Sequence, residues 1–203
     1  MKRIILLFHI LTISLLFASC NSNKKAEPLV QQGNINLSDW DLEKDGIIKL
    51  DGDWEFYWNK LYTPEEINND SFIKQKSFCE VPGVWSKQKF FPDKLPGEGF
   101  GTYHLKVKLN QKYDVLGIKI LDFSSSYKLW INNEPVASNG IVSANLNEVE
   151  HQILPQIKCF KAHGDSLDIV VQVANFFHHD GGMWKSVRIG TLDQIIANRE
   201  KRL

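Results

Sequence analysis

Two groups of side chains in this 203-residue sequence could do chemistry. The first is His178-His179-Asp180, because imidazole and carboxylate groups are ordinary ligands of Zn²⁺. Adjacent residues of a strand point to opposite faces, so the two imidazoles could share one ion only within a loop. We favour the alternative of a polar loop, in which Gly181 and Gly182 supply tight backbone geometry, and we expect no metal and no other cofactor.

The second group consists of aromatic side chains in segments rich in glycine and proline, where a monomer has little reason to expose them unless they contact a ligand. Aromatic faces stack on the apolar face of a sugar ring, and histidine or asparagine side chains then bind its hydroxyl groups. The alternative, which we favour for each tryptophan taken alone, is that Trp85 and Trp184 cap the ends of a sandwich core. The residues that we predict as a ligand-contact surface are Trp85, Phe91, Tyr127, His178, His179 and Trp184.

The remaining patterns do not indicate an enzyme. A glycoside hydrolase needs two carboxylates that face each other across a cleft. A Gly-Xaa-Ser-Xaa-Gly elbow, a phosphate-binding glycine loop and a His-Glu-Xaa-Xaa-His helix are all missing from the sequence. Basic and acidic residues number 24 each, and without a long basic run we expect no nucleic-acid partner.

The amino terminus has the pattern of a signal peptide. Lys2 and Arg3 precede a 14-residue apolar run over residues 4–17, which is shorter than the roughly 20 residues that span a bilayer as a helix. The following Ala18-Ser19-Cys20 resembles the lipobox of bacterial lipoproteins, in which the cysteine is lipidated. The lipobox usually has leucine three residues before the cysteine, and this sequence has Phe17 at that position. The alternative is a plain secretory signal that is cut near Ala18 and Ser19, with Cys20 incidental.

These observations predict a lipoprotein signal peptide over residues 1–19 and a lipidated tether over 20–39, because this segment is polar and has no apolar period. We expect a membrane-anchored lipoprotein of the bacterial cell envelope that faces the periplasm or the exterior. An oxidising compartment permits a disulfide between Cys79 and Cys159, but their apolar neighbours fit buried free thiols equally well.

The elements that must position these groups are mostly strands. Apolar residues recur with a period of two, which is typical of half-buried strands, and the intervening turns are rich in glycine, proline, asparagine and aspartate. We therefore predict one all-β domain over residues 40–190, an antiparallel β-sandwich. The predicted strands are 47–50, 54–58, 103–109, 116–121, 127–131, 149–154, 167–173 and 183–189.

Two stretches favour a helix. One lies near residues 64–70, where Thr63 is the expected N-cap and Pro64 the first helical residue. The other is a helical tail within residues 191–203.

Four segments in order carry a resemblance: residues 50–58 (LDGDWEFYW), 81–85 (VPGVW), 99–103 (GFGTY) and 129–133 (LWINN). They are similar to the amino-terminal jelly-roll of β-galactosidase and β-glucuronidase enzymes, which has a galactose-binding-like fold. The departure is Asn133, where that family usually has glycine. In those enzymes the catalytic carboxylates lie on a separate barrel domain, which this chain is too short to contain, so the resemblance does not imply an enzyme.

A fifth segment, residues 173–184 (VANFFHHDGGMW), together with Ile189-Gly190, resembles the extracellular jelly-roll of bacterial seven-transmembrane receptors with diverse intracellular signalling modules. The resemblance implies a sensor that acts in signal transduction. The departure is that only 13 residues follow Gly190, without a membrane-spanning run. We expect a free-standing lipoprotein rather than a fragment of a longer receptor.

The sequence thus favours an extracytoplasmic, lipid-anchored sensor domain that binds a carbohydrate or another small ligand and is coupled to a membrane signalling protein. The alternative is a structural or assembly lipoprotein that uses the jelly-roll as a protein-interaction surface. Since a fold does not fix a function, the two hypotheses share every prediction about the elements.

Overall fold

The computed structural model describes residues 25–69, 76–88 and 94–200. The predicted signal peptide, Cys20 and Phe91 lie outside these residues. The strands are β1 (Asn34–Leu37), β2 (Ile48–Lys49), β3 (Gly52–Trp58), β4 (Ser77–Val81), β5 (Gly99–Ile120), β6 (Ser126–Ile131), β7 (Glu134–Asn139), β8 (Gln156–Asn175) and β9 (Arg188–Gly190). The helices are α2 (Pro64–Ile67) and α3 (Leu192–Glu200), with short 3-10 turns η1 (Trp85–Lys87) and η2 (Leu146–Glu148).

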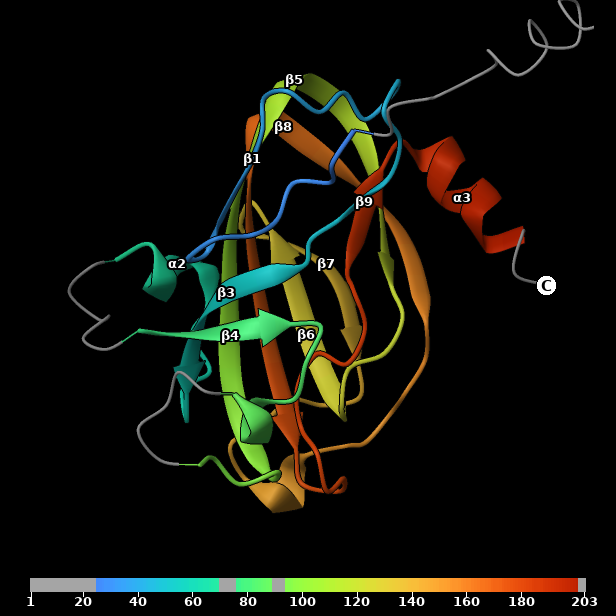
Figure 1. The fold of residues 1–203 in the computed structure, drawn as a ribbon. Coiled ribbons are helices and arrows are strands. Elements are labelled where there is room, and N and C mark those ends of the chain that lie inside the picture. Colours follow the sequence, from blue (N-terminus) through green and yellow to red (C-terminus); the bar gives the residue numbers. More distant parts are fainter. Residues whose placement is uncertain (1–24, 70–75, 89–93, 201–203) are drawn as a thin grey trace, which may run out of the picture.

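Two long strands, β5 and β8, connect the two layers of the fold. They pair antiparallel over nearly their whole length, with a register shift between Lys108 and Val115. Figure 1 shows both strands bending over the upper end of the molecule, so that each contributes one half to either layer. One layer contains β4, β3, β5, β8, β6 and β7, and the other contains β2, β9, β5 and β8.

The core lies between these layers and follows the period of two that the sequence shows. Trp54 and Phe56 of β3 face inward, as do Tyr103 and Leu105 of β5, and none of the four exposes any side-chain surface. The structure therefore confirms the predicted all-β sandwich. It also confirms a short helix near residue 64 and a C-terminal helix.

The predicted tether is wrong over its second half. Residues 34–37 form β1, which pairs in parallel with Lys106–Leu109 of β5. Val30, Ile35 and Leu37 are buried in the core. The alternation Asn34-Ile35-Asn36-Leu37 holds only two apolar residues, which is too short a pattern to stand out in a polar segment. Because β1 and β5 run parallel, this pairing also departs from the expected antiparallel order.

One predicted strand is absent from the described part of the chain, and another forms only at its end. Residues 149–154 make a single bridge, between Glu150 and Ile141, and Ile153 and Leu154 are exposed. In the segment 183–189 only the end joins a strand, β9. Met183 and Val187 are buried there, yet their carbonyls accept hydrogen bonds from loop residues. Their apolar character reflects loop packing, which a period of two cannot distinguish from a strand.

Helix α2 is short because its ends are fixed by side chains and turns. The Thr63 hydroxyl accepts a hydrogen bond from Glu66 N–H, and the Glu66 carboxylate accepts one from Thr63 N–H, which completes a capping box. The helix ends at Ile67, before the predicted residue 70. Among the described residues, none of the helices is long and apolar enough to cross a membrane.

Both cysteines of the described domain are free thiols. Cys79 is buried beside the Tyr103 hydroxyl, whereas Cys159 is exposed on β8. The sequence left open a disulfide or two buried free thiols. The described domain has two free thiols, of which only Cys79 is buried.

Candidate ligand-binding site

Loops from both layers meet at the lower end of the sandwich in Figure 1. Backbone hydrogen bonds join them, because Gly83 N–H donates to Met183 O at 2.8 Å and Ser124 N–H donates to Gly182 O at 3.0 Å. Gly182 has a φ of +132°, a backbone conformation that favours glycine. The described loop segments that meet here are residues 82–88, 94–98, 121–125, 140–155 and 176–187.

Four rings from two of these loops form a row on this end. Phe177 lies 5.8 Å from His151, His151 lies 5.5 Å from His178, and His178 lies 5.3 Å from Trp184, measured between ring centroids. Phe177 is 54% exposed and His151 is exposed, whereas His178 and Trp184 are half-buried. We call these four residues the ring row.

The ring row carries polar atoms that have no partner in the described part of the chain. The Trp184 Nε1–H group is buried and makes no hydrogen bond, and neither imidazole of the row has a hydrogen-bond partner there. The Trp184 Nε1–H group is too deeply buried to meet a ligand in this structure, so the groups of the row that are open to a ligand are the Phe177 ring and the two imidazoles. The row thus combines flat apolar faces with free donors and acceptors.

Asn175 holds the loop that carries Phe177 and His178. Its side-chain amide donates to Gly97 O at 2.8 Å and to His178 O at 2.7 Å, and its side-chain oxygen accepts from His178 N–H at 3.0 Å. Asn175 is fully buried, so these bonds are shielded from water. The position of the His178 ring is therefore fixed by the last residue of β8.

Two residues of the predicted contact surface lie in the core instead. Trp85 is fully buried, packs against Phe56 and Trp58, and donates its Nε1–H to Pro96 O at 2.9 Å. Tyr127 is 2% exposed and packs against Phe123. The alternative interpretation as a core cap holds for Trp85, because a ring this large removes more apolar area from water inside the sandwich than at a loop surface.

The two adjacent histidines have different surroundings. His178 belongs to the ring row, whereas the His179 side chain is 96% exposed and its Nδ1 lies 3.3 Å from Asp180 Oδ1. Asp180 also accepts hydrogen bonds from Ser86 and Lys87, and these contacts lower the pKa of its carboxyl. Within the described ranges no cluster of three metal-ligating side chains occurs.

The sequence missed His151 and Phe177. The sequence could have indicated Phe177, because this residue lies inside the motif 173–184 and two positions before the predicted His179. His151 carried no local signal. It belongs to a different loop, and only the tertiary structure brings it between Phe177 and His178.

A second titratable cluster, also missed by the sequence, lies on the outer face of the larger layer. His104 is 3% exposed and stands between two carboxylates, with Nδ1 at 2.8 Å from Glu55 Oε2 and Nε2 at 2.6 Å from Asp168 Oδ1. The three residues come from adjacent strands, β3, β5 and β8. Both ring nitrogens face an acceptor, so the geometry fits an imidazolium that donates to two carboxylates.

The charges of this cluster support one another. Burial alone would raise the pKa of Glu55, but hydrogen bonds from His104, Lys76 and Tyr57 outweigh it and lower this pKa to about 2. Burial alone would lower the pKa of His104, but its hydrogen bonds to Asp168 and Glu55 raise it. Burial opposes the shift at Asp168 too, and the hydrogen bond from His104 lowers the pKa of that carboxyl.

Comparisons with known proteins give the class of fold. No protein-family model and no curated protein matches the chain. Among solved structures, the chain is similar to a GH2 β-galacturonidase from Eisenbergiella tayi bound to galacturonate, with 14% identity and a TM-score of 0.50 over 71% of this chain and 24% of that one. It is also similar to a β-glucuronidase of an uncultured Clostridium species, with 14% identity and a TM-score of 0.51 over 70% of this chain and 28% of that one.

These likenesses confirm the predicted fold, a jelly-roll such as occurs in glycoside hydrolases. The chain spans about a quarter of the length of the structures that it matches. At this identity the likeness concerns the fold alone.

Proposed function

We propose that this chain is a lipid-anchored, extracytoplasmic jelly-roll that binds a carbohydrate at the ring row and passes its occupancy to a membrane signalling partner. The observation that carries the proposal is the ring row itself, with a 54% exposed Phe177 and two imidazoles that have no hydrogen-bond partner among the described residues. Ring faces of this kind stack on the C–H face of a sugar, and each aromatic contact contributes about 0.5–1.5 kcal/mol beyond the buried area. The imidazole nitrogens supply partners for hydroxyl groups.

The place of the ring row supports anchoring through Cys20. The first described residues lie at the upper end of Figure 1, close to α3, whereas the loop 176–187, which follows β8 and carries three residues of the ring row, reaches the lower end. Lys25 already forms an ion pair with Asp45 at 2.9 Å, so four residues, 21–24, lie between the proposed anchor Cys20 and the domain. The chain from Cys20 to Lys25 reaches at most about 18 Å when extended. A domain attached this way presents its ring row away from the membrane.

The test is calorimetry and thermal unfolding of residues 22–203, a segment that contains every described core residue, with neutral mono- and oligosaccharides. We expect a sugar that raises the melting temperature with concentration, following RT ln(1 + [L]/Kd). Phe177→Ala should abolish the shift, because the exposed ring adds contact area and little stability. Val115→Ala is the matched control, since Val115 is 47% exposed and belongs to β5, outside the loops that carry the ring row. A shift that survives Phe177→Ala would contradict the proposed site.

A second candidate function is a protein-interaction surface, and one observation favours it. The 140–155 loop beside the ring row exposes four aliphatic side chains, a larger apolar surface than a small sugar needs. They are Ile141, Leu146, Ile153 and Leu154, with exposures from 39% to 54%. If no sugar shifts the unfolding transition, and crosslinking in the membrane captures a partner that Leu154→Asp loses, this second function holds instead.

A further inference from the structure

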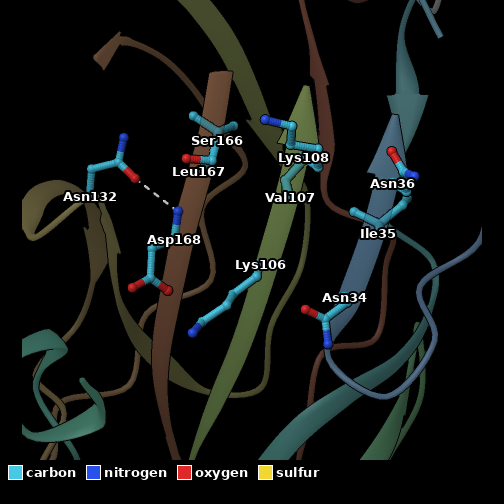
Figure 2. A pocket seen from close by; sticks show the side chains of 10 residues that line it. All are labelled: Asn34, Ile35, Asn36, Lys106, Val107, Lys108, Asn132, Ser166, Leu167 and Asp168. Carbon is cyan, nitrogen blue, oxygen red and sulfur yellow. Dashed lines mark hydrogen bonds between the residues drawn. The ribbon is translucent and has the colours of Figure 1, made fainter. Parts of the chain in front are cut away.

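A groove of about 480 Å³ lies on the outer face of the sheet, where β1, β5 and β8 run side by side (Figure 2). Its volume falls within the range of small-molecule pockets, about 300–1,000 Å³. The walls come from every second residue of each strand, because the residues between them point into the core. The side chains of the walls are Asn34 and Asn36 of β1, Lys106 and Lys108 of β5, and Ser166 and Asp168 of β8.

The two lysines of the groove differ in their partners. Lys108 Nζ donates to Asp165 Oδ2 at 2.6 Å, so its charge is compensated. Lys106 is exposed, and within the described ranges its Nζ makes neither a hydrogen bond nor an ion pair. Figure 2 shows its side chain extending along the groove between β5 and β8. The ammonium of Lys106 is therefore available to a ligand.

Asp168 attracts this ammonium, and the charge of Lys106 contributes to the lowered pKa of that carboxyl, but the two side chains form no direct ion pair because both Asp168 oxygens bind other partners. Oδ1 lies 2.6 Å from His104 Nε2, and Oδ2 accepts from the Asn68 side-chain amide at 3.0 Å. Asn132 fixes the same residue through its backbone, since Asp168 N–H donates to Asn132 Oδ1 at 2.8 Å. The imidazolium of His104 already pairs with the negative charge of the Asp168 carboxylate.

The remaining polar groups of the groove offer both donors and acceptors. The Asn36 side-chain oxygen accepts from Ser38 N–H at 2.9 Å, so its amide N–H groups stay free. The Ser166 hydroxyl has no hydrogen-bond partner in the described part of the chain. The Asn34 amide donates to Gln32 O at 2.9 Å, which leaves its oxygen as an acceptor. Asn36 thus offers donors, Asn34 offers an acceptor, the Ser166 hydroxyl can donate or accept, and Lys106 adds one positive charge.

We propose that this groove is a second binding site, which takes a small hydroxyl-rich carboxylate, a sugar acid of the hexuronate class. Lys106 Nζ binds the carboxylate, and the Asn36 amide and the Ser166 hydroxyl bind hydroxyl groups. The groove walls contain no aromatic side chain among the described residues, so binding here rests on charge and hydrogen bonds rather than on stacking. This separates the groove from the ring row, which lies on loops at the other end of β5 and β8.

The test is an NMR and calorimetric titration of residues 22–203 with mannuronate, with mannose as its neutral counterpart and with acetate as the bare anion. We expect mannuronate to bind about tenfold or more tightly than either control, because each lacks one of the two recognised features. Raising the ionic strength from about 0.01 M to about 1 M should weaken binding strongly, because the Debye length falls from about 30 Å to about 3 Å.

Variants locate the site. Lys106→Ala should weaken mannuronate binding by about tenfold or more, the loss of one charge-assisted hydrogen bond. Lys158→Ala, an exposed lysine of β8 outside the groove, is the matched control and should bind as the parent chain does. Unchanged binding by Lys106→Ala, or equal binding of acetate, overturns the proposal. Phe177→Ala should leave mannuronate binding intact, and a loss in that variant assigns the sugar acid to the ring row and also overturns the groove.

Discussion

Replacing His104 by glutamine tests the buried charge cluster, and its effect follows from the structure. Glutamine is neutral and carries its two N–H donors on one nitrogen, whereas Glu55 and Asp168 bind two separate ring nitrogens of His104, so the largely buried carboxylates lose their common cation. Their side chains are 13% and 23% exposed, and that of His104 is 4% exposed. Removing one partner from a buried charge pair costs about 3–5 kcal/mol. Both carboxylates keep other donors, so we expect the lower end, about 3 kcal/mol of unfolding free energy.

The pH dependence has a definite sign. The pKa of His104 is raised in the folded state, so its contribution is complete below its ordinary value of 6.5 and is lost as the pH rises through the raised pKa. The pKa of Glu55 is lowered from 4.5 to about 2, so its contribution is complete above 4.5 and is lost as the pH falls toward 2. The cluster therefore stabilises the fold most between about pH 4.5 and 6.5.

The assay is urea unfolding of the parent chain and His104→Gln at several pH values. Near pH 6 the variant should unfold about 6–12 °C lower in a parallel thermal scan, and the gap should narrow at alkaline pH, where the parent loses the same imidazolium. His179→Gln is the matched control, because the 96% exposed His179 side chain should contribute little. A gap that stays constant from pH 6 to pH 10 would refute the reasoning.

Three further predictions concern the core and the thiols. Trp85→Ala should cost about 3–5 kcal/mol in urea unfolding, because it empties a fully buried site; a loss below about 1 kcal/mol would place Trp85 at the surface after all. Leu37→Ala should cost about 2–5 kcal/mol in the same assay, since Leu37 is 0% exposed, whereas a flexible tether would tolerate it. Burial raises the pKa of the Cys79 thiol to about 12, so alkylation mapped by mass spectrometry should label Cys159 in the folded chain and Cys79 only in denaturant. Equal labelling of both thiols without denaturant would contradict this arrangement.

The sequence was most informative where a strand has one buried face. In β3 the residues Trp54 and Phe56 face the core, as their alternation with Glu55 and Tyr57 predicts. The same rule failed for residues 149–154, where Ile153 and Leu154 are exposed in a loop. An apolar residue reports a preference for burial, but a loop that packs against another loop, or that exposes a binding surface, uses the same residues.

The candidate sites were less accessible from the sequence. His178 and Trp184 were found because they lie in one short motif, but His151 reaches the same row from a loop 27 positions earlier. Trp85 and Trp184 both follow glycine-containing loop sequence, yet one is buried and the other is half-exposed. Residue type alone does not tell whether neighbouring loops cover a ring.

The sequence by itself determined the all-β class, the sandwich and the C-terminal helix, because these follow from local periodicity and turn chemistry. Only the tertiary structure decided that residues 34–37 complete the sheet and that Glu55, His104 and Asp168 meet across three strands. It also decided which lysine of the groove stays unpaired. The physical reason is the same in each case: pairing between strands is set by contacts between residues far apart in the chain, and such contacts leave no local period in the sequence.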